Sequence, residues 1–574
     1  MKIYQGIAGS DGVAAGPVKI GRDSIVSIDV PVHVSTGETE AQLRKLENSI
    51  AAVRREITDL AEKAKIQIGA QAAEIFEAQL MILEDPEIID KIREKISTEH
   101  LSAVYALQQV IDSTCCEMNS LENEYMRARA SDIRDVGNRL QLSCSGCRAP
   151  NQEGMDPYIF VAADVTPSDT MSLDTSKIQA IVSEKGSKTS HAVILARSMG
   201  IPAVIGATGI LSHLKNGETV IVNGKDGTVI AEPTPEQIQE TLGQNRKAQS
   251  KRDWVVHRAE LTAKTLDGVD VTVEGNIGSP DDVNNVLKNG GDGIGLFRSE
   301  FFYMNRGDFP SEEEQFEAYR KVAEALNGKT AVIRTMDIGG DKHLSYFQLP
   351  EEANPFLGYR ALRISLHMHE VFKPQLRAIL RASSFGSLAI MFPMVSCVEE
   401  IRAAKEVLEQ CKQELREEGA SFDETIKSGI MVEIPSIAMQ AEAAAKEVDF
   451  FSIGTNDLLQ YMLAADRMNE KVAYLYNPYH PGVLSLIRHV LSSARKAGIP
   501  AAMCGELAGD LEATPILLGL GLRCFSMNAH SIPFVKEKIR TLSFEVCSRL
   551  AESAIKAATA EEVRSLFASH SAVE

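Results

Sequence analysis

The chain has 574 residues, which is too long for one hydrophobic core and indicates about three compact domains. Its formal net charge of -19 argues against non-specific nucleic-acid binding, because such binding needs Lys and Arg side chains that displace counterions from phosphates. Nine scattered cysteines, an odd number, are typical of reduced thiols rather than of a disulfide framework. The start of the chain, Met1 to Ile20, is too polar and glycine-rich for a signal peptide, and no apolar run reaches the roughly 20 residues of a membrane span, so we expect a cytoplasmic protein.

A helical unit is expected early in the chain. Apolar residues recur there in alternating steps of three and four, which is the seam of a helix packed against other helices. These residues are Leu43, Leu46, Ile50, Val53, Ile57 and Leu60. The helical pattern stops near Asp85-Pro86 and resumes in segments that end near Leu140. The charged faces of these helices fit either solvation or the docking of a basic partner.

From about Pro150 the pattern changes to short β-rich runs separated by glycine turns, which indicates a small α/β unit. The runs are Tyr158 to Ala162, Ile178 to Ser183 and Thr219 to Val222. The following stretch, Pro235 to Ala263, is polar and helix-prone. We expect it to be a connector that lets the α/β unit move.

Thr189-Ser190-His191 lies between a β-rich run and an amphipathic stretch, Ala192 to Met199, which places His191 at the start of a helix. Free N–H groups and the helix dipole favour an anion there and disfavour the imidazolium. A neutral ring nitrogen at this point is able to attack phosphorus. A capped helix start with an incidental histidine fits these residues equally well.

From about Thr265 onward, β-rich runs alternate with longer helical segments about eight times, which predicts a (β/α)₈ barrel. The runs are Val269 to Val273, Gly293 to Phe297, Ala331 to Ile333, Leu388 to Phe392, Gly429 to Val432, Phe450 to Ile453, Ala501 to Met503 and Cys524 to Ser526. In this fold the C-terminal ends of the strands build the active site. The residues that follow the runs are Asn276, Arg298, Arg334, Glu433, Asn456 with Asp457, and Cys504.

Arg298, Arg334 and Arg467 would converge at such a barrel mouth and offer forked donors to a small, multiply charged anion, although scattered arginines also form surface ion pairs. Glu433 and Asp457 end successive strands and form a hard-oxygen pair suited to Mg²⁺. The alternative is that neighbouring arginines satisfy both carboxylates.

Cys504 is delivered to the same mouth by an apolar strand, Ala501 to Met503. An unperturbed thiol has a pKa of about 8.5 and is mostly protonated at neutral pH. It could therefore donate a proton to a carbanion or enolate, or attack as a thiolate. We favour the role of an acid.

The chain resembles the enzyme I family of the bacterial phosphotransferase system, the phosphoenolpyruvate-protein phosphotransferases within the PEP-utilizing enzymes, nearly from end to end. The matching segments before residue 200 are Gly6-Ile7-Ala8, Ala15-Gly16-Pro17, Ile75-Phe76-Glu77-Ala78, Leu83-Glu84-Asp85, Asp132-Ile133-Arg134-Asp135 and Thr189-Ser190-His191. Those in the expected barrel are Gly295 to Phe301, Arg334 to Lys342, Asn354 to Gly358 and Phe451 to Leu458.

The resemblance implies a multidomain α and α/β protein. Its parts would be a swivelling phosphohistidine domain (1–25 plus 145–235), an inserted helical domain that docks the carrier HPr (26–144), a helical linker (236–262), and a phosphoenolpyruvate-binding and dimerisation barrel (263–574). It implies that phosphoenolpyruvate phosphorylates His191 on Nε2, with Thr170 orienting the ring. It also implies that Glu433 and Asp457 bind Mg²⁺ and that Cys504 protonates the enolate as pyruvate forms. The residues implied to line the substrate pocket are Arg298, Arg334, Lys342, Arg360, Asn456, Asp457 and Arg467.

Some residues depart from the family pattern. Gly186-Ser187-Lys188 replaces the usual Gly-Gly-Arg before the Thr-Ser-His triplet, and Ala192 replaces threonine after it. Gln79 stands where histidine is frequent, and Ser299 where threonine is usual. These changes bear on rate and on partner fit, and they leave open a catalytically weak regulatory or scaffold homologue.

A second rival is an ATP-using relative such as pyruvate phosphate dikinase or phosphoenolpyruvate synthase. Those enzymes carry a large nucleotide-binding domain before the histidine domain. This chain has a helical unit there without a phosphate loop, which argues against them.

Overall fold

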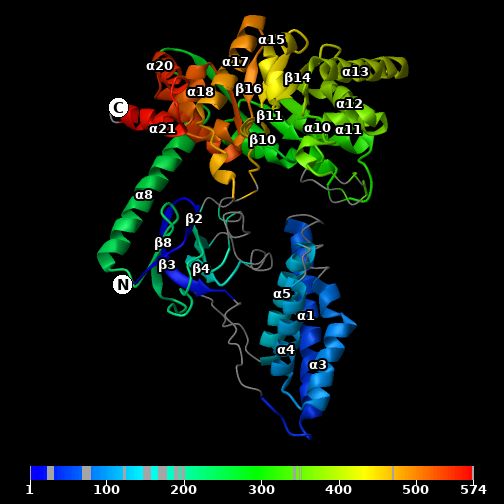
Figure 1. Cartoon of the computed structure of the whole chain (residues 1–574), viewed down its shortest axis with the longest axis vertical. Helices are drawn as coiled ribbons and strands as arrows, with labels where there is room; N and C mark the ends of the chain where they lie inside the picture. The colour runs from blue at the N-terminus through cyan, green and yellow to red at the C-terminus, as the bar shows by residue number, and fades with distance from the viewer. Residues whose placement is uncertain are drawn as a thin grey trace. The chain divides into compact units, whose positions relative to one another are not determined.

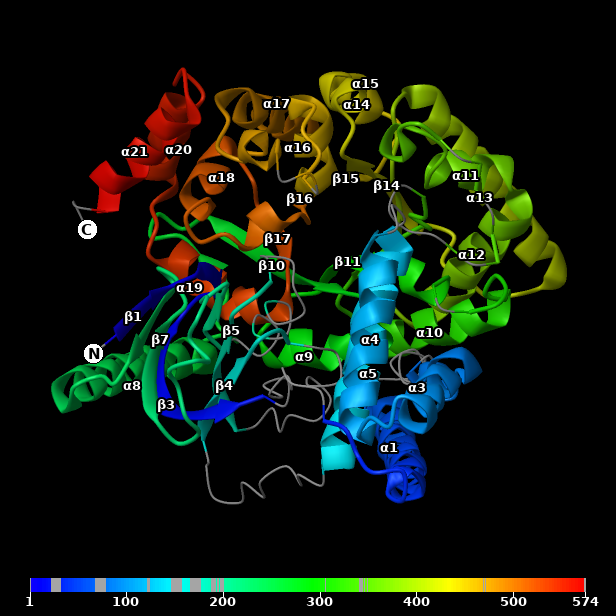
Figure 2. The same ribbon diagram turned by 60° about the horizontal axis from the view of Figure 1, so that its bottom comes forward.

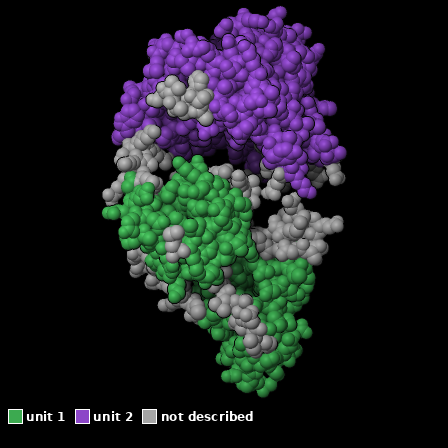
Figure 3. All heavy atoms as spheres, turned by 60° about the vertical axis from the view of Figure 1, so that its left-hand side comes forward, with its two compact units in different colours: residues 1–250 green, residues 251–574 purple. Residues whose placement is uncertain are grey.

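The computed structural model describes residues 2–571 except 22–31, 68–78, 121–123, 146–156, 166–176, 187–192, 194–195, 197–200, 305, 340–343, 345, 348, 351, 468 and 470. The chain divides into two compact units, residues 1–250 and 251–574 (Figure 3). Among the described residues, no helix combines the length and the apolarity that crossing a lipid bilayer requires.

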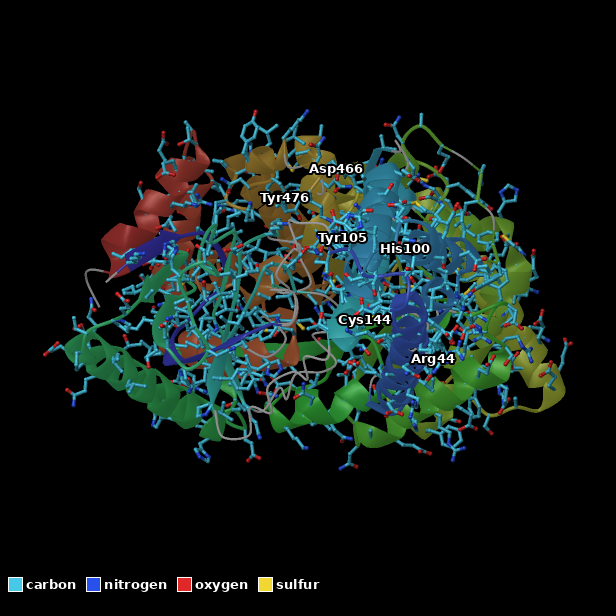
Figure 4. All side chains as sticks on the ribbon, turned by 90° about the horizontal axis from the view of Figure 1, so that it is seen from below. Arg44, His100, Tyr105, Cys144, Asp466 and Tyr476 are labelled. Carbon is cyan, nitrogen blue, oxygen red and sulfur yellow. The ribbon has the colours of Figure 1, made fainter. Side chains whose placement is uncertain are left out.

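The predicted helical unit is present as a bundle in the first unit (Figure 1). Its helices are α1 (Thr39–Gln67), α3 (Pro86–Thr98), α4 (Ala103–Ser120) and α5 (Glu124–Ser145). Leu46, Val53 and Ile57 of the predicted seam are buried in the bundle core, and Cys144 of α5, which Figure 4 labels, is buried in the same core. The seam was therefore predicted correctly for the side chains that the structure describes.

The predicted break at Asp85-Pro86 is the start of α3. Asp85 caps this helix, since its carboxylate accepts a hydrogen bond from the N–H of Glu87 at 2.9 Å. Pro86 occupies the first turn, where its missing N–H costs no hydrogen bond.

The α/β part of the first unit contains an eight-stranded mixed sheet with the order β1-β8-β7-β3-β4-β5-β6-β2. The strands are β1 (Lys2–Gln5), β2 (Ile7–Ser10), β3 (Val13–Ile20), β4 (Tyr158–Ala162), β5 (Ile178–Ser183), β6 (Ala203–Ile205), β7 (Thr219–Asn223) and β8 (Thr228–Ala231). Strands β3 to β6 pair in parallel, whereas β1, β2, β7 and β8 join through antiparallel pairs. Because β3 pairs with β4, which lies on the far side of the bundle in the sequence, the bundle is an insertion into this α/β fold.

The segment that carries the predicted nucleophile lies outside the described residues, as do His191 and Thr170 themselves. Within the predicted amphipathic stretch, Val193 and Ala196 are described as helical, and both are buried. They pack in a cluster with Tyr158 and Phe160 of β4. The predicted helix is therefore present at the two positions of this stretch that the structure describes.

The predicted connector forms helix α8 (Pro235–His257), and the boundary between the two units falls within it. After α8, the short strand β9 (Ala263–Lys264) pairs antiparallel with the first barrel strand. The predicted mobility of the connector stays a prediction.

The second unit is the predicted (β/α)₈ barrel (Figures 1 and 2). Its strands are β10 (Asp270–Ile277), β11 (Ile294–Arg298), β12 (Ala331–Arg334), β13 (Leu388–Phe392), β14 (Lys427–Val432), β15 (Phe450–Ile453), β16 (Ala501–Met503) and β17 (Cys524–Met527). All eight pair in parallel, and β10 closes the barrel by pairing with both β11 and β17.

Helices surround these strands (Figure 2). They are α9 (Val283–Lys288), α10 (Glu312–Ala325), α11 (Leu362–His367), α12 (His369–Ala382), α13 (Val398–Glu418), α14 (Pro435–Met439), α15 (Ala441–Ala444), α16 (Thr455–Leu463), α17 (Pro481–Ala497), α18 (Thr514–Leu520), α19 (Ile532–Arg540), α20 (Phe544–Ala554) and α21 (Ala560–Ser571). One continuous apolar core joins strands and helices, which is why strands such as β13 read as unbroken apolar runs, whereas the first barrel strand, β10, alternates in burial.

Candidate active site

The ends of the barrel strands bring the predicted site residues to one rim. Arg298 and Arg334 are the last residues of β11 and β12, and they are paired in register. Glu433 directly follows β14, and Cys504 directly follows β16. The carboxyl ends of parallel barrel strands form one face of the barrel, so these side chains share that face.

Buried charges of alternating sign form a network of ion pairs at this rim. Arg334 forms ion pairs with Glu300 and with Asp337, the latter at 2.8 Å. Asp337 also pairs with Arg360 at 3.0 Å, and Arg360 reaches Asp457 at 3.5 Å. All five residues are buried. Buried charges are tolerated only when they are paired, so each charged side chain of this network needs its neighbours to stay ionised.

The two arginines stay charged in this environment. Burial lowers the pKa of the Arg334 guanidinium, but the carboxylates of Glu300 and Asp337 outweigh that effect and raise it above its ordinary value. The same balance raises the pKa of Arg360, with Asp337 and Asp457 as its main counter-charges. The rim therefore offers permanent cations with forked donors.

Glu433 is only 1% exposed, and one of its carboxylate oxygens accepts a hydrogen bond from the Met394 N–H at 2.6 Å. The other oxygen lies against Gly454, where a Cβ would come within 2.9 Å of it. Burial, together with the nearby charges of Asp457 and Asp337, raises the pKa of Glu433 to about 8. Without a cation, this carboxyl group therefore holds a proton near neutral pH.

Glu433 and Asp457 fit a divalent cation by their chemistry. The charge of Asp457 contributes to the raised pKa of Glu433, and Oδ1 of Asp457 is buried without a hydrogen-bond partner among the described residues. Hard carboxylate oxygens suit Mg²⁺, which binds through one or two protein carboxylates and completes its shell with water and substrate oxygens. Across the described part of the chain, no group of three or more His, Cys, Asp and Glu side chains is arranged to hold a metal.

Cys504 is buried, and its Sγ lies 3.8 Å from the carbonyl oxygen of Ile453. Burial, together with the charge of Glu433, raises the pKa of the thiol, although the nearby Ser452 hydroxyl and the charges of Arg334 and Arg298 act in the opposite direction. The thiol is therefore protonated at neutral pH, as an acid requires and as a thiolate nucleophile does not.

Asn456 and Arg467 lie beside this network of buried ion pairs. The Asn456 side chain exchanges hydrogen bonds with Glu506, and its backbone carbonyl accepts one from the hydroxyl of Tyr476 at 3.0 Å. Burial raises the pKa of Tyr476 to about 12, an effect that the neighbouring Arg467 partly offsets. Tyr476, labelled in Figure 4, thus connects the two predicted residues.

The structure therefore gathers Arg298, Arg334, Arg360, Glu433, Asn456, Asp457, Arg467 and Cys504 at or beside the rim. His191, Thr170 and Lys342 lie outside the described residues, so the structure does not place them.

Four rim residues had no role in the sequence interpretation. Glu300 and Asp337 follow the ends of β11 and β12 by two and three residues. A search that extended three residues beyond each strand end would therefore have found them. Tyr461 lies on α16 and accepts a hydrogen bond from Arg360 at 3.2 Å. Met394 adopts a left-handed backbone with φ of 56°, which aims its N–H at Glu433. Neither of these last two leaves a signal in the sequence.

Comparison with known proteins places this architecture in one class. The family model described as PEP-utilising enzyme, PEP-binding domain, matches residues 252–544, a range that contains every rim residue named above. The models described as PEP-utilising enzyme, N-terminal, and PEP-utilising enzyme, mobile domain, match residues 5–129 and 154–227. The fold and the charged rim therefore define a multidomain PEP-utilising enzyme.

Curated relatives narrow this class. Phosphoenolpyruvate-protein phosphotransferases of Staphylococcus aureus (strain MRSA252) and Geobacillus stearothermophilus are each 45% identical to this chain, over 563 and 567 residues. Both alignments cover 98% of this chain, and they cover 98% and 97% of the relatives. A solution structure of Enzyme I is 33% identical with a TM-score of 0.36, and the match covers 43% of this chain and 99% of that one. The chain belongs to the family of phosphoenolpyruvate-protein phosphotransferases, which confirms the resemblance found in the sequence.

Proposed function

We propose that the chain transfers the phosphoryl group of phosphoenolpyruvate to His191 and then to a histidine of the carrier HPr, releasing pyruvate. This would be the first step of the sugar phosphotransferase system. The observation that carries the proposal is the rim of permanently charged, buried arginines beside a carboxylate pair and a protonated thiol. The 45% identity to phosphoenolpyruvate-protein phosphotransferases over nearly the whole chain supports it.

In this proposal the rim holds the substrate through its cations. Arg298 and Arg334 offer forked donors that match phosphate and carboxylate oxygens. The remaining pocket residues are Lys342, Arg360, Asn456, Asp457 and Arg467. Low polarity around the buried Arg334 and Arg360 strengthens their attraction for a multiply charged anion.

Glu433 and Asp457 would hold Mg²⁺ in this site. When bound, the ion supplies positive charge that neutralises the phosphate and stabilises a developing enolate oxygen. Binding also removes the reason for Glu433 to keep its proton, because a cation favours the ionised carboxylate.

The transfer step balances with the residues of this chain. The Nε2 nitrogen of His191, oriented by Thr170, attacks phosphorus as the bond to the enol oxygen breaks, and the electron pair stays on the enolate. Cys504 then gives its proton to the enolate carbon, which yields pyruvate and a thiolate. Arg298 and Arg334 stabilise that thiolate until it takes a proton from solvent.

Phosphotransfer to a carrier requires His191 to visit two partners. The helical domain would dock HPr, the barrel would bind phosphoenolpyruvate and form the homodimer, and the α8 segment would let the phosphohistidine domain swing between them.

The test is Mg²⁺-dependent transfer of labelled phosphate from phosphoenolpyruvate to the full chain, with and without HPr and with and without ATP. Acid-labile, base-stable label that passes to HPr supports the full relay. Label that appears only with ATP would favour an ATP-using relative. A chain that takes no label at all would instead be the regulatory or scaffold homologue that the Gly186-Ser187-Lys188 departure allows.

We expect the stability of the metal-free protein to fall as the pH rises from about 5 to about 8. A buried carboxyl with a raised pKa contributes stability that is complete below its unfolded-state pKa and is lost as the pH passes its folded-state value. One proton corresponds to a slope of at most about 1.4 kcal/mol per pH unit. Mg²⁺ should therefore raise the melting temperature more at about pH 8 than at about pH 6.

Thermal unfolding of the full chain with and without Mg²⁺ measures this effect. Glu433→Gln removes the titrating group while it keeps the size of the side chain, so this variant should lose that part of the pH slope. An identical slope in wild type and Glu433→Gln would show that another group is responsible.

A further inference from the structure

A chain of buried polar side chains links helix α12 to the ends of strands β11 and β12. Gln375 on α12 donates from Nε2 to the hydroxyl of Ser299 at 2.9 Å. Its Oε1 accepts from the backbone N–H of Met336 at 2.9 Å. The Ser299 hydroxyl in turn donates to the backbone carbonyl of Arg334 at 2.6 Å. Gln375 and Ser299 are 1% and 0% exposed, so these hydrogen bonds are made away from solvent.

The direction of each hydrogen bond in this network follows from its donors. The Met336 N–H can only donate, so Gln375 turns its carbonyl oxygen to Met336 and its NH₂ group to the hydroxyls. The Ser299 hydroxyl accepts a hydrogen bond from that NH₂ group, so its own O–H donates a hydrogen bond to the backbone carbonyl of Arg334. Gln375 also donates to the hydroxyl of Tyr319 at 3.2 Å. The Tyr319 O–H in turn donates a hydrogen bond to Oε1 of Gln315.

These contacts hold the backbone on both sides of Thr335. Gln375 binds Met336 directly and Arg334 through Ser299. The next residue, Asp337, bridges the two buried arginines of the rim, Arg334 at 2.8 Å and Arg360 at 3.0 Å. A backbone shift in this segment would therefore move Arg334 and also Asp337, the carboxylate that holds both Arg334 and Arg360 in place.

We propose that Gln375 and Ser299 are positioning residues that set the affinity of the rim for phosphoenolpyruvate. They touch no substrate themselves and act through Arg334 and Asp337. This inference rests on the proposed function, because it assigns them to that phosphoenolpyruvate site. Misplacement of a substrate-positioning group by about 1 Å can cost on the order of 100-fold in reaction rate, which sets the upper end of the expected effect.

A purely structural role would also explain a satisfied buried network, so the test needs a matched control. Ser383 provides it, because this buried serine also donates to a backbone carbonyl, that of Leu380 at 2.6 Å, and accepts one hydrogen bond, from the Asp423 N–H at 2.8 Å. Both contacts lie at the end of α12 and in the loop before β14, away from the rim. Ser383→Ala therefore removes the same kinds of hydrogen bond as Ser299→Ala without touching Arg334.

The experiment uses the full chain and the variants Ser299→Ala, Gln375→Met, their double variant, Ser299→Thr and Ser383→Ala. Calorimetric titration with phosphoenolpyruvate and Mg²⁺, with each chain also carrying His191→Ala so that no phosphoryl group is transferred, gives the dissociation constant. Transfer of labelled phosphate gives KM and kcat, and thermal unfolding gives the loss of stability. Ser299→Ala keeps the inference testable if Gln375→Met does not fold.

We expect Ser299→Ala and Gln375→Met each to raise the dissociation constant and KM for phosphoenolpyruvate by on the order of ten- to a hundredfold. Ser299→Thr keeps the hydroxyl and should stay close to wild type. The double variant should lose more affinity than either single variant but less than the sum of their losses, because both changes break the Gln375–Ser299 hydrogen bond while each also breaks a contact of its own. Ser383→Ala should lose comparable stability while its affinity stays unchanged.

Equal affinity losses in Ser299→Ala and Ser383→Ala, or additive losses in the double variant, would overturn the positioning role. If wild type binds phosphoenolpyruvate and the variants bind it equally well, only this inference fails. If wild type does not bind phosphoenolpyruvate, both this inference and the proposed function fail.

Discussion

His191→Ala should take up no label from phosphoenolpyruvate, while its melting temperature stays close to that of wild type. A phosphoryl group needs a nucleophile, and the methyl group of alanine offers none, so the loss should be complete rather than partial. Gel autoradiography after incubation with labelled phosphoenolpyruvate and Mg²⁺ checks this result, and the same sample treated with HPr shows whether label is passed on.

The matched control is His213→Ala. His213 belongs to the same α/β domain, is exposed, and has its ring near the Ser212 hydroxyl and the Gly209 carbonyl. This variant should accept label as wild type does. Label retained by His191→Ala would show that another residue is the nucleophile and would remove the phosphohistidine assignment.

Cys504→Ala should slow pyruvate formation by roughly 10²- to 10⁴-fold, the range that one positioned acid contributes. Burial keeps the thiol protonated in the folded protein, so wild type holds a proton at the rim when the enolate forms. The variant should still exchange phosphate with the histidine to some degree, because that step needs no proton on carbon. Coupled detection of pyruvate, compared with isotope exchange into phosphoenolpyruvate, separates the two steps.

Cys411→Ala controls for the loss of a buried thiol. Cys411 lies on helix α13 in the apolar core of the same barrel, and its Sγ is 4.0 Å from the Lys373 carbonyl. This variant should form pyruvate at the wild-type rate. Unchanged turnover in Cys504→Ala would exclude the proton-donor role.

Much of the barrel could be predicted because its strands are buried on both faces. A strand such as Leu388–Phe392 is apolar at every position, so it is visible without its neighbours. Arg298 and Arg334 end such runs, and the strand-end rule of this fold made them candidates before any geometry was known. The helical seam of α1 was visible for a related reason, since one face repeats at the helical period.

The first three strands were not predicted individually. Lys2–Gln5 and Ile7–Ser10 have only four residues each, and Val13–Ile20 contains both a glycine and a proline. Their β-structure depends on pairing with strands such as β8, β6 and β4 that follow the inserted bundle in the sequence. Local propensity carries little information about partners at that separation.

The sequence by itself determined that Arg298, Arg334, Glu433 and Cys504 reach the barrel rim, because apolar strands and their ends are local properties that a single chain displays. The tertiary structure decided how those residues act on one another. It paired Arg334 with Glu300 and Asp337, buried Glu433 so that its pKa rises to about 8, and kept the Cys504 thiol protonated. These outcomes depend on burial and on distances of a few ångströms between segments far apart in the chain, and only the folded barrel sets them.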